Sequence, residues 1–162
     1  MDQRMSKDKY YLNIADAVLD RSTCLRRKYG AIIVKNDEIL STGYNGAPRG
    51  RVNCSQLGYC NREQLNIPSG QRYELCRSVH AEANAIISAS RRDMVGGTLY
   101  LLGRNAQTGE LLTDATSCPM CRRMVINAGL ARVVIRRTPE EFTVADVEEW
   151  VRTDDLALPE KI

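Results

Sequence analysis

The stretch Arg77-Ser-Val-His-Ala-Glu-Ala-Asn-Ala-Ile86 contains the only histidine of the chain, His80, and an acidic residue, Glu82, two positions further on. Much later comes Cys118-Pro-Met-Cys121, a cysteine pair with metal-ligand spacing. A catalytic zinc site uses three protein ligands and leaves its fourth position to water. We therefore predict that His80, Cys118 and Cys121 bind a zinc ion and that Glu82 moves protons beside it.

Both motifs stand where a helix is expected to begin. Residues i and i+2 of a regular helix do not face each other, so His80 and Glu82 can serve one centre only at an irregular helix start. Residues 81–89 are rich in helix formers. Pro119 suits the first position of a helix that Cys118 caps. The positive ends of two helices would then favour thiolate over thiol, and hydroxide over water, at the metal.

Each motif alone has a simpler explanation. A single histidine is often a hydrogen-bonded core or surface residue, and a lone Cys-x-x-Cys can be a redox pair or half of a structural zinc site. The combination of His-x-Glu with Cys-x-x-Cys is the signature of zinc-dependent nucleobase deaminases, in which the glutamate is a general acid/base and not a ligand. We therefore expect a catalytic zinc site of the deaminase type.

Length and composition limit the class of protein. The 162 residues suffice for one domain with a real core, and we expect residues 1–162 to form a single domain. A net charge of +3 gives no argument for nucleic acid as the main partner. No apolar run approaches the ~20 residues that span a membrane. Residues 1–10 lack the apolar segment of a secretory signal, so we expect a cytoplasmic protein with reduced cysteines.

Hydrophobic patterns predict strands that alternate with helices after an initial hairpin. The expected fold is α/β, with a mixed sheet covered by helices on both faces. Residues 45–77 have no period and contain three cysteines, which suggests a cross-linked or functional loop. The expected elements are a helix at 6–20, strands at 31–34, 39–44, 98–102 and 132–136, helices from 81 and 118, and a short helix at 144–151 anchored by Trp150.

Four further cysteines remain, which is the number that a closed structural zinc site requires. Their spacing matches no standard zinc finger, so small buried thiols are the alternative, or a disulfide if the cytoplasmic expectation fails. A second zinc would hold the aperiodic loop against the domain. The proposed ligands are Cys24, Cys54, Cys60 and Cys76.

Together these motifs resemble the deoxycytidylate (dCMP) deaminase family of the cytidine deaminase superfamily, a group that includes a late-competence operon protein of bacteria. The resemblance spans residues 22–135. It rests on Thr23-Cys-Leu-Arg-Arg-x-x-Gly30, Gly43-Tyr-Asn-Gly46, Glu74-Leu-Cys-Arg-Ser-Val-His-Ala-Glu82, and Cys118-x-x-Cys121 followed by Ile126-Asn-Ala-Gly129. The resemblance implies a three-layer α/β/α sandwich, hydrolysis of dCMP to dUMP and ammonia, and a homo-hexamer. It also supports the second zinc, because some members have structural ligands at positions matching Cys24 and Cys54.

The resemblance also implies how substrate and effectors bind. Asn45 would contact the sugar hydroxyl, and the backbone at Ala81 would face the pyrimidine edge. Arg26 and Arg27 are the candidates for binding the phosphate, although a solvated basic surface would explain them equally well. The family is often activated by dCTP with Mg²⁺ and inhibited by dTTP through the Gly43-Tyr-Asn-Gly46 region, which could also be a plain tight turn.

One departure from the family pattern concerns the metal motif. The family usually has proline immediately before the first cysteine, where this chain has Ser117. The ligand spacing is intact, so zinc binding should survive, but the pocket wall at Ser117 is expected to differ.

Two other functions compete with dCMP deamination. A tRNA adenosine deaminase would call for a broad basic face, and a non-enzymatic zinc module would have no use for the unliganded carboxylate of Glu82.

Overall fold

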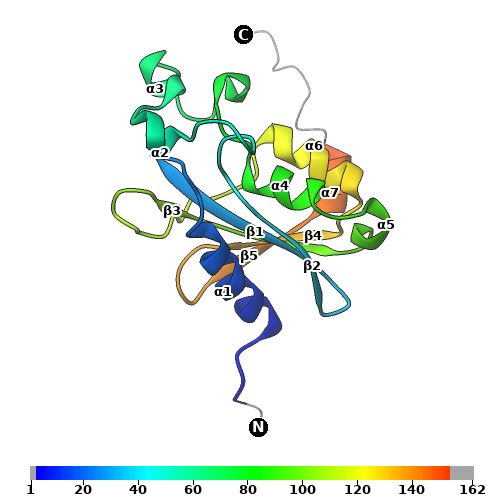
Figure 1. Ribbon diagram of the computed structural model, residues 1–162. Coiled ribbons are helices and arrows are strands. Elements are labelled where there is room, and N and C mark those ends of the chain that lie inside the picture. The colour runs from blue at the N-terminus through cyan, green and yellow to red at the C-terminus, as the bar shows by residue number, and fades with distance from the viewer. Residues whose placement is uncertain (1–2, 154–162) are drawn as a thin grey trace.

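The computed structural model describes residues 3–153, which form a five-stranded sheet between two layers of helices (Figure 1). The strands follow the order β2-β1-β3-β4-β5. Neighbouring strands β3 and β4 are parallel, and the other neighbouring pairs are antiparallel. The predicted mixed sheet is therefore confirmed. The strand bounds are Arg27–Lys35 (β1), Glu38–Tyr44 (β2), Thr98–Asn105 (β3), Arg132–Arg136 (β4) and Phe142–Asp146 (β5).

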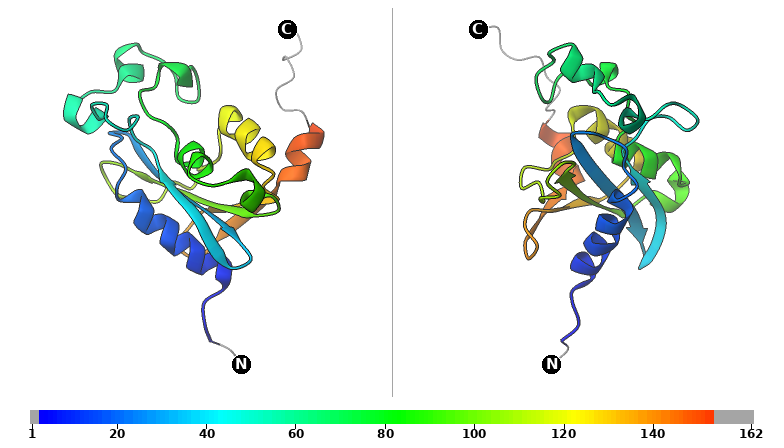
Figure 2. Two further views of the ribbon diagram at one scale, coloured as in Figure 1. Left: turned by 45° about the vertical axis from the view of Figure 1, so that its right-hand side comes forward. Right: turned by 60° about the vertical axis from the view of Figure 1, so that its left-hand side comes forward.

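Successive side chains of the central strands enter two separate cores, because side chains alternate between the faces of a sheet. Ile33 and Leu99 lie in one core, and Ile32 and Tyr100 lie in the other. Helix α1 covers the second core, while α4 and α6 cover the first from the opposite side of the sheet (Figure 2). This arrangement confirms the predicted three-layer sandwich. The helix bounds are Lys7–Leu19 (α1), Ala81–Ile87 (α4), Arg91–Met94 (α5), Pro119–Ala128 (α6) and Val147–Thr153 (α7).

The hairpin β1–β2 forms where the sequence predicts it. Asn36 and Asp37 connect the strands with φ values of 52° and 61°, and these residue types tolerate the left-handed conformation that a tight hairpin turn requires. Gly30 to Val34 of β1 are all buried, as expected for a central strand covered on both faces.

The prediction for the C-terminal segment is wrong in part. A helix was expected at 144–151, whereas Phe142–Asp146 forms β5, antiparallel to β4, and the helix α7 begins only at Val147. The β-branched residues Thr143 and Val144 favour a strand, and pairing also covers the edge that β4 would otherwise expose. The predicted anchor is present, since the Trp150 ring packs on the first core with the Arg122 guanidinium 5.0 Å from its centroid.

The aperiodic segment 45–77 contains only short helical turns, and it lies over one end of the sheet (Figure 1). An isolated bridge between Gly46 and Val79 connects this segment to the body of the domain. The helical turns are Cys54–Leu57 (α2), Asn61–Gln64 (α3) and Tyr73–Leu75 (η1).

None of the helices within residues 3–153 has the length and apolar composition to cross a membrane.

Candidate active site

The start of α4 carries the first motif. His80 is the N-cap residue, with φ −70° and ψ 155°, and Glu82 lies in the first helical turn. This is the irregular helix start that the His-x-Glu spacing predicts. The helix backbone lies directly against β2 at Gly43, which has no side chain. A Cβ atom at this position would come within 2.2 Å of the Ala81 carbonyl oxygen. The Ser41 hydroxyl also donates to the Ala85 carbonyl at 2.6 Å. The sheet therefore fixes the position of the motif.

The start of α6 carries the second motif. Cys118 is the N-cap residue and Pro119 follows as the first helical residue, as the sequence predicts. The Cys121 backbone N–H donates to the Cys118 sulfur at 3.4 Å. Two helix N-termini thus meet at one point, and each contributes part of the metal-binding motif.

The three predicted metal ligands converge. His80 Nδ1 lies 3.5 Å from Cys118 Sγ and 3.3 Å from Cys121 Sγ, and the three ligand atoms all lie within 4.8 Å of one another. Bonds of about 2.0 Å to nitrogen and 2.3 Å to sulfur, at tetrahedral angles, would place N and S about 3.5 Å apart. The spacing and the donor set therefore fit a zinc ion.

A metal ion that binds to this cluster must displace the protons that its side chains carry. Burial lowers the pKa of His80, but hydrogen bonds to Cys118 and Cys76 outweigh this effect and raise it to about 10. A hydrogen bond from Cys121 lowers the pKa of Cys118 to about 4. The same bond, together with burial, raises the pKa of Cys121. Without metal these shifts favour a thiolate at Cys118 and protons on Cys121 and His80.

Glu82 lies beside this cluster and is not part of it. The side chain is buried, and burial raises the pKa of its carboxyl group above the ordinary value. Ser117, only 1% exposed, donates its hydroxyl to Glu82 Oε1 at 3.0 Å. The residue that departs from the family pattern thus orients the carboxylate. Sequence reasoning questioned the pocket wall at Ser117 but missed this contact.

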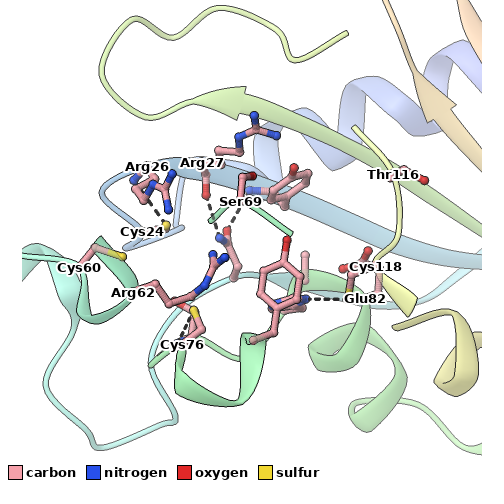
Figure 3. Close-up of a pocket in the computed structure, with 16 residues that line it drawn as sticks. Cys24, Arg26, Arg27, Cys60, Arg62, Ser69, Cys76, Glu82, Thr116 and Cys118 are labelled. Carbon is pink, nitrogen blue, oxygen red and sulfur yellow. Dashed lines mark hydrogen bonds between the residues drawn. The ribbon is translucent and has the colours of Figure 1, made fainter. Parts of the chain in front are cut away.

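His80 and Glu82 open onto a cleft of about 770 Å³, counting its open mouth (Figure 3). All four residues predicted to bind substrate line the cleft, and so do three of the four cysteines predicted to hold a second metal. These residues are Asn45, Ala81, Arg26 and Arg27, with Cys24, Cys60 and Cys76.

Asn45 is buried and largely occupied by internal hydrogen bonds. Its Oδ1 accepts from the Tyr29 backbone N–H at 2.8 Å and from the Ser22 hydroxyl at 2.5 Å. Its Nδ2 donates to the Arg27 carbonyl at 2.8 Å. A carboxamide has two N–H donors, so one remains to meet a ligand. The contacts hold this donor rigidly in the cleft.

Arg26 and Arg27 each have an acidic partner. Arg26 Nε lies 2.9 Å from a Glu63 carboxylate oxygen, and an Arg27 nitrogen lies 3.5 Å from Asp114. Hydrogen bonding to Tyr29 is the main cause that raises the pKa of Arg27. A substrate phosphate would therefore compete with a carboxylate at both positions.

The four cysteines of the predicted second site are neighbours but do not form a compact cluster. Burial, followed by the charges of Cys24, Cys76 and Cys60, raises the pKa of Cys54. Within residues 3–153, however, these sulfurs do not form a group of three ligands close enough to hold one metal ion. All four are free thiols, so the disulfide alternative is not observed.

Two residues of the aperiodic segment complete the cleft and were missed by sequence reasoning. The Tyr73 ring meets the His80 ring edge-on, with centroids 4.9 Å apart. The Arg62 guanidinium lies over the Tyr73 ring, 4.6 Å from its centroid. The segment has no periodicity from which the direction of either side chain could be predicted.

An open three-ligand metal site beside a buried proton carrier is characteristic of metal-dependent hydrolases. Residues 5–137 match the family described as the cytidine and deoxycytidylate deaminase zinc-binding region. The chain belongs to this family, and the resemblance stated from its motifs is confirmed.

Individual relatives agree with this assignment. Deoxycytidylate deaminase of Mycobacterium phage D29 is 39% identical over 132 residues, which cover 78% of this chain and 91% of the phage protein. The Schizosaccharomyces pombe deoxycytidylate deaminase is 33% identical over 81% of this chain, which spans only 37% of the yeast protein. Among solved structures, the dCMP deaminase of cyanophage S-TIM5 in complex with dCMP and dUMP has a TM-score of 0.58 at 28% identity, covering 82% of this chain and 84% of that chain.

Proposed function

We propose that this protein is a zinc-dependent deaminase that hydrolyses dCMP to dUMP and ammonia. The observation that carries the proposal is Glu82, a buried carboxylate beside three converged ligands and open to the cleft. A purely structural metal site has no use for such a group. The relatives named deoxycytidylate deaminase and the nucleotide-bound phage structure support dCMP as the substrate.

His80, Cys118 and Cys121 would hold the zinc ion, and when bound the metal supplies a polarised water molecule at neutral pH. Glu82 accepts a proton from the attacking water and passes one to N3 of the cytosine ring. It then takes the remaining proton from the oxygen now bonded to C4 and delivers it to the amino group as the C4–N bond breaks. The water oxygen becomes O4 of the uracil and ammonia leaves. The raised pKa of Glu82 suits a group that must both take and give protons.

Asn45 and the backbone at Ala81 are proposed to hold the nucleoside. The free N–H of the Asn45 amide would donate to the sugar hydroxyl, and the first turn of α4 would present its backbone to the pyrimidine edge. Arg26 and Arg27 are proposed to lie near the phosphate. If Arg26 has this role, its replacement should weaken dCMP turnover far more than deoxycytidine turnover, whereas an equal loss would refute it.

A second, structural zinc ion at Cys24, Cys54, Cys60 and Cys76 is also proposed. Two backbone amides support it: Arg26 N–H donates to the Cys24 sulfur at 3.5 Å, and Ser78 N–H donates to the Cys76 sulfur at 3.4 Å. Such hydrogen bonds would orient the two sulfur atoms as metal ligands. Metal analysis tests the idea, since two zinc ions per chain would support it and one would refute it.

The remaining properties are proposed from the family resemblance. Residues 1–162 would work as one deaminase domain in the cytoplasm and assemble as a homo-hexamer. Activation by dCTP with Mg²⁺ and inhibition by dTTP would act through the region around Gly43 to Gly46. Analytical ultracentrifugation and initial rates with each effector would test the assembly and the regulation separately.

The decisive assay compares dCMP, dCTP, deoxycytidine and a tRNA anticodon stem as substrates. Ammonia release from dCMP is expected, and Glu82→Gln should lower kcat by about 10²–10⁴ while zinc remains bound. Turnover that persists in Glu82→Gln would contradict the mechanism. Deamination of tRNA alone would contradict the nucleotide substrate, and no deamination of any substrate would favour the non-enzymatic zinc module.

A further inference from the structure

We propose that Arg62, more than Arg26 or Arg27, recognises the 5′-phosphate of the substrate and so makes the enzyme select nucleotides over nucleosides. This inference rests on the proposed deaminase function. Arg62 belongs to the short helix α3, within the aperiodic segment, and it lines the same cleft as His80 and Glu82. Figure 3 shows its side chain directed into the cleft from the side opposite Cys118.

The guanidinium of Arg62 is buried and rigidly held. Its Nε donates to the Gln71 carbonyl at 3.1 Å and one Nη donates to the Pro68 carbonyl at 2.9 Å. The Tyr73 ring covers one face of the group. The residue as a whole is only 6% exposed. Such fixation removes most of the conformational entropy that an arginine otherwise loses when it binds a ligand.

The guanidinium of Arg62 has no carboxylate partner within residues 3–153, although its charge interacts with the Cys76 thiol. Throughout the part of the chain that the structure describes, no carboxylate oxygen lies within 4.0 Å of this guanidinium, whereas Arg26 and Arg27 have Glu63 and Asp114. The hydrogen bonds to the Pro68 and Gln71 carbonyls do not require a charged side chain, because a neutral donor could make them equally well. Burying a full charge is costly unless a counter-charge arrives. The second Nη group carries donors that neither carbonyl uses, and paired N–H donors match phosphate geometry.

The position of Arg62 relative to the metal ligands fits a nucleotide. The Tyr73 ring contacts both groups, with its centroid 4.6 Å from the Arg62 guanidinium and 4.9 Å from the centroid of the His80 ring. A nucleoside monophosphate has its base and its phosphate on opposite sides of one sugar, so a base at Glu82 would bring its phosphate towards the arginine end of the cleft. Ser69, on the loop that Arg62 holds, also lines the cleft and adds a hydroxyl donor.

The test is the ratio of kcat/KM for dCMP to kcat/KM for deoxycytidine, measured on the zinc-loaded full chain. Arg62→Gln is expected to lower the dCMP value about 100-fold and the deoxycytidine value less than threefold. Arg62→Lys keeps the charge but loses the planar fork, and it should lower the ratio about tenfold. Arg136→Gln removes another buried arginine, one that does not line the cleft, and should leave the ratio unchanged.

The outcomes separate the inference from the function on which it rests. Equal losses for both substrates, or an unchanged ratio in Arg62→Gln, would overturn the phosphate role while dCMP deamination stands. If Arg62→Gln does not fold, an unchanged ratio in Arg62→Lys overturns it. Loss of one zinc ion per chain together with equal losses would show that Arg62 instead balances the thiolates of Cys24, Cys60 and Cys76. A wild-type protein that deaminates neither substrate would refute the proposed function and, with it, this inference.

Discussion

Two groups of cysteines in this chain differ in how far the fold prepares them. Cys118 and Cys121 lie with His80 at the starts of two helices that pack on the sheet. The distances between their ligand atoms already fit binding of one zinc ion. Cys24, Cys54, Cys60 and Cys76 belong to loops and short turns, and their sulfurs are neighbours without forming a compact cluster. Packing against a sheet can assemble a site before the metal arrives, whereas a site on irregular segments needs the metal to complete it.

The comparison predicts that removing a ligand from the first group destroys activity and leaves the fold intact. Cys121→Ser should lower kcat for dCMP by about three orders of magnitude or more, because the metal's stabilisation of charge is worth several kcal/mol. The sheet and both cores should remain, since packing rather than metal holds α6 in place. Circular dichroism and rate measurements on the same sample would check this. A variant that unfolds would show that the first site also depends on metal for its structure.

Removing a ligand from the second group should have the reverse effect. Cys54→Ser is expected to lower the zinc content by one ion per chain and to lower the free energy of unfolding by several kcal/mol, because metal binding to such a site contributes to folding. Chemical denaturation with and without a chelator would measure the difference. If the variant and the parent unfold at the same denaturant concentration, the four cysteines are only buried thiols.

The pH dependence of zinc binding would sharpen the description of the first group. Between the pKa of Cys118, about 4, and that of His80, about 10, the metal-free cluster holds protons on His80 and Cys121 that zinc must displace. Zinc affinity should therefore rise with pH, by about a hundredfold per unit where both protons are released. Competition with a chelator at pH 5 to 7 would measure the slope. A slope near zero would mean that both groups are already deprotonated.

The smallest expected effect concerns the orientation of Glu82. Ser117→Ala removes the hydroxyl that donates to its carboxylate, and kcat should fall about tenfold with little change in KM, as for one hydrogen bond to a charged group. Ser41→Ala is a matched control, because Ser41 is another buried serine that hydrogen-bonds to α4, at Ala85. The control should lose stability without losing kcat. Similar kcat values for both variants would show that Ser117 only supports the fold.

The same contrast explains what the sequence could predict. The convergence of His80, Cys118 and Cys121, with Glu82 beside them, was predictable because fixed spacings at helix starts translate directly into geometry. The strands followed from their apolar runs. Arg62 and Tyr73 were not, because segment 45–77 has no period and its short turns depend on contacts distant in sequence. The strand β5 was missed because its pairing with β4 decides the conformation of residues that alone also allow a helix.

Gly43 has a consequence for how this fold can vary. It touches neither the metal ligands nor the cleft, yet no methyl group fits between β2 and the backbone of α4 at Ala81 and Ala85. Any side chain there would lift the helix and carry the imidazole away from its sulfur partners. A residue outside the cleft therefore fixes the height of α4 above the sheet, and the position of the metal-binding motif tolerates no substitution at Gly43.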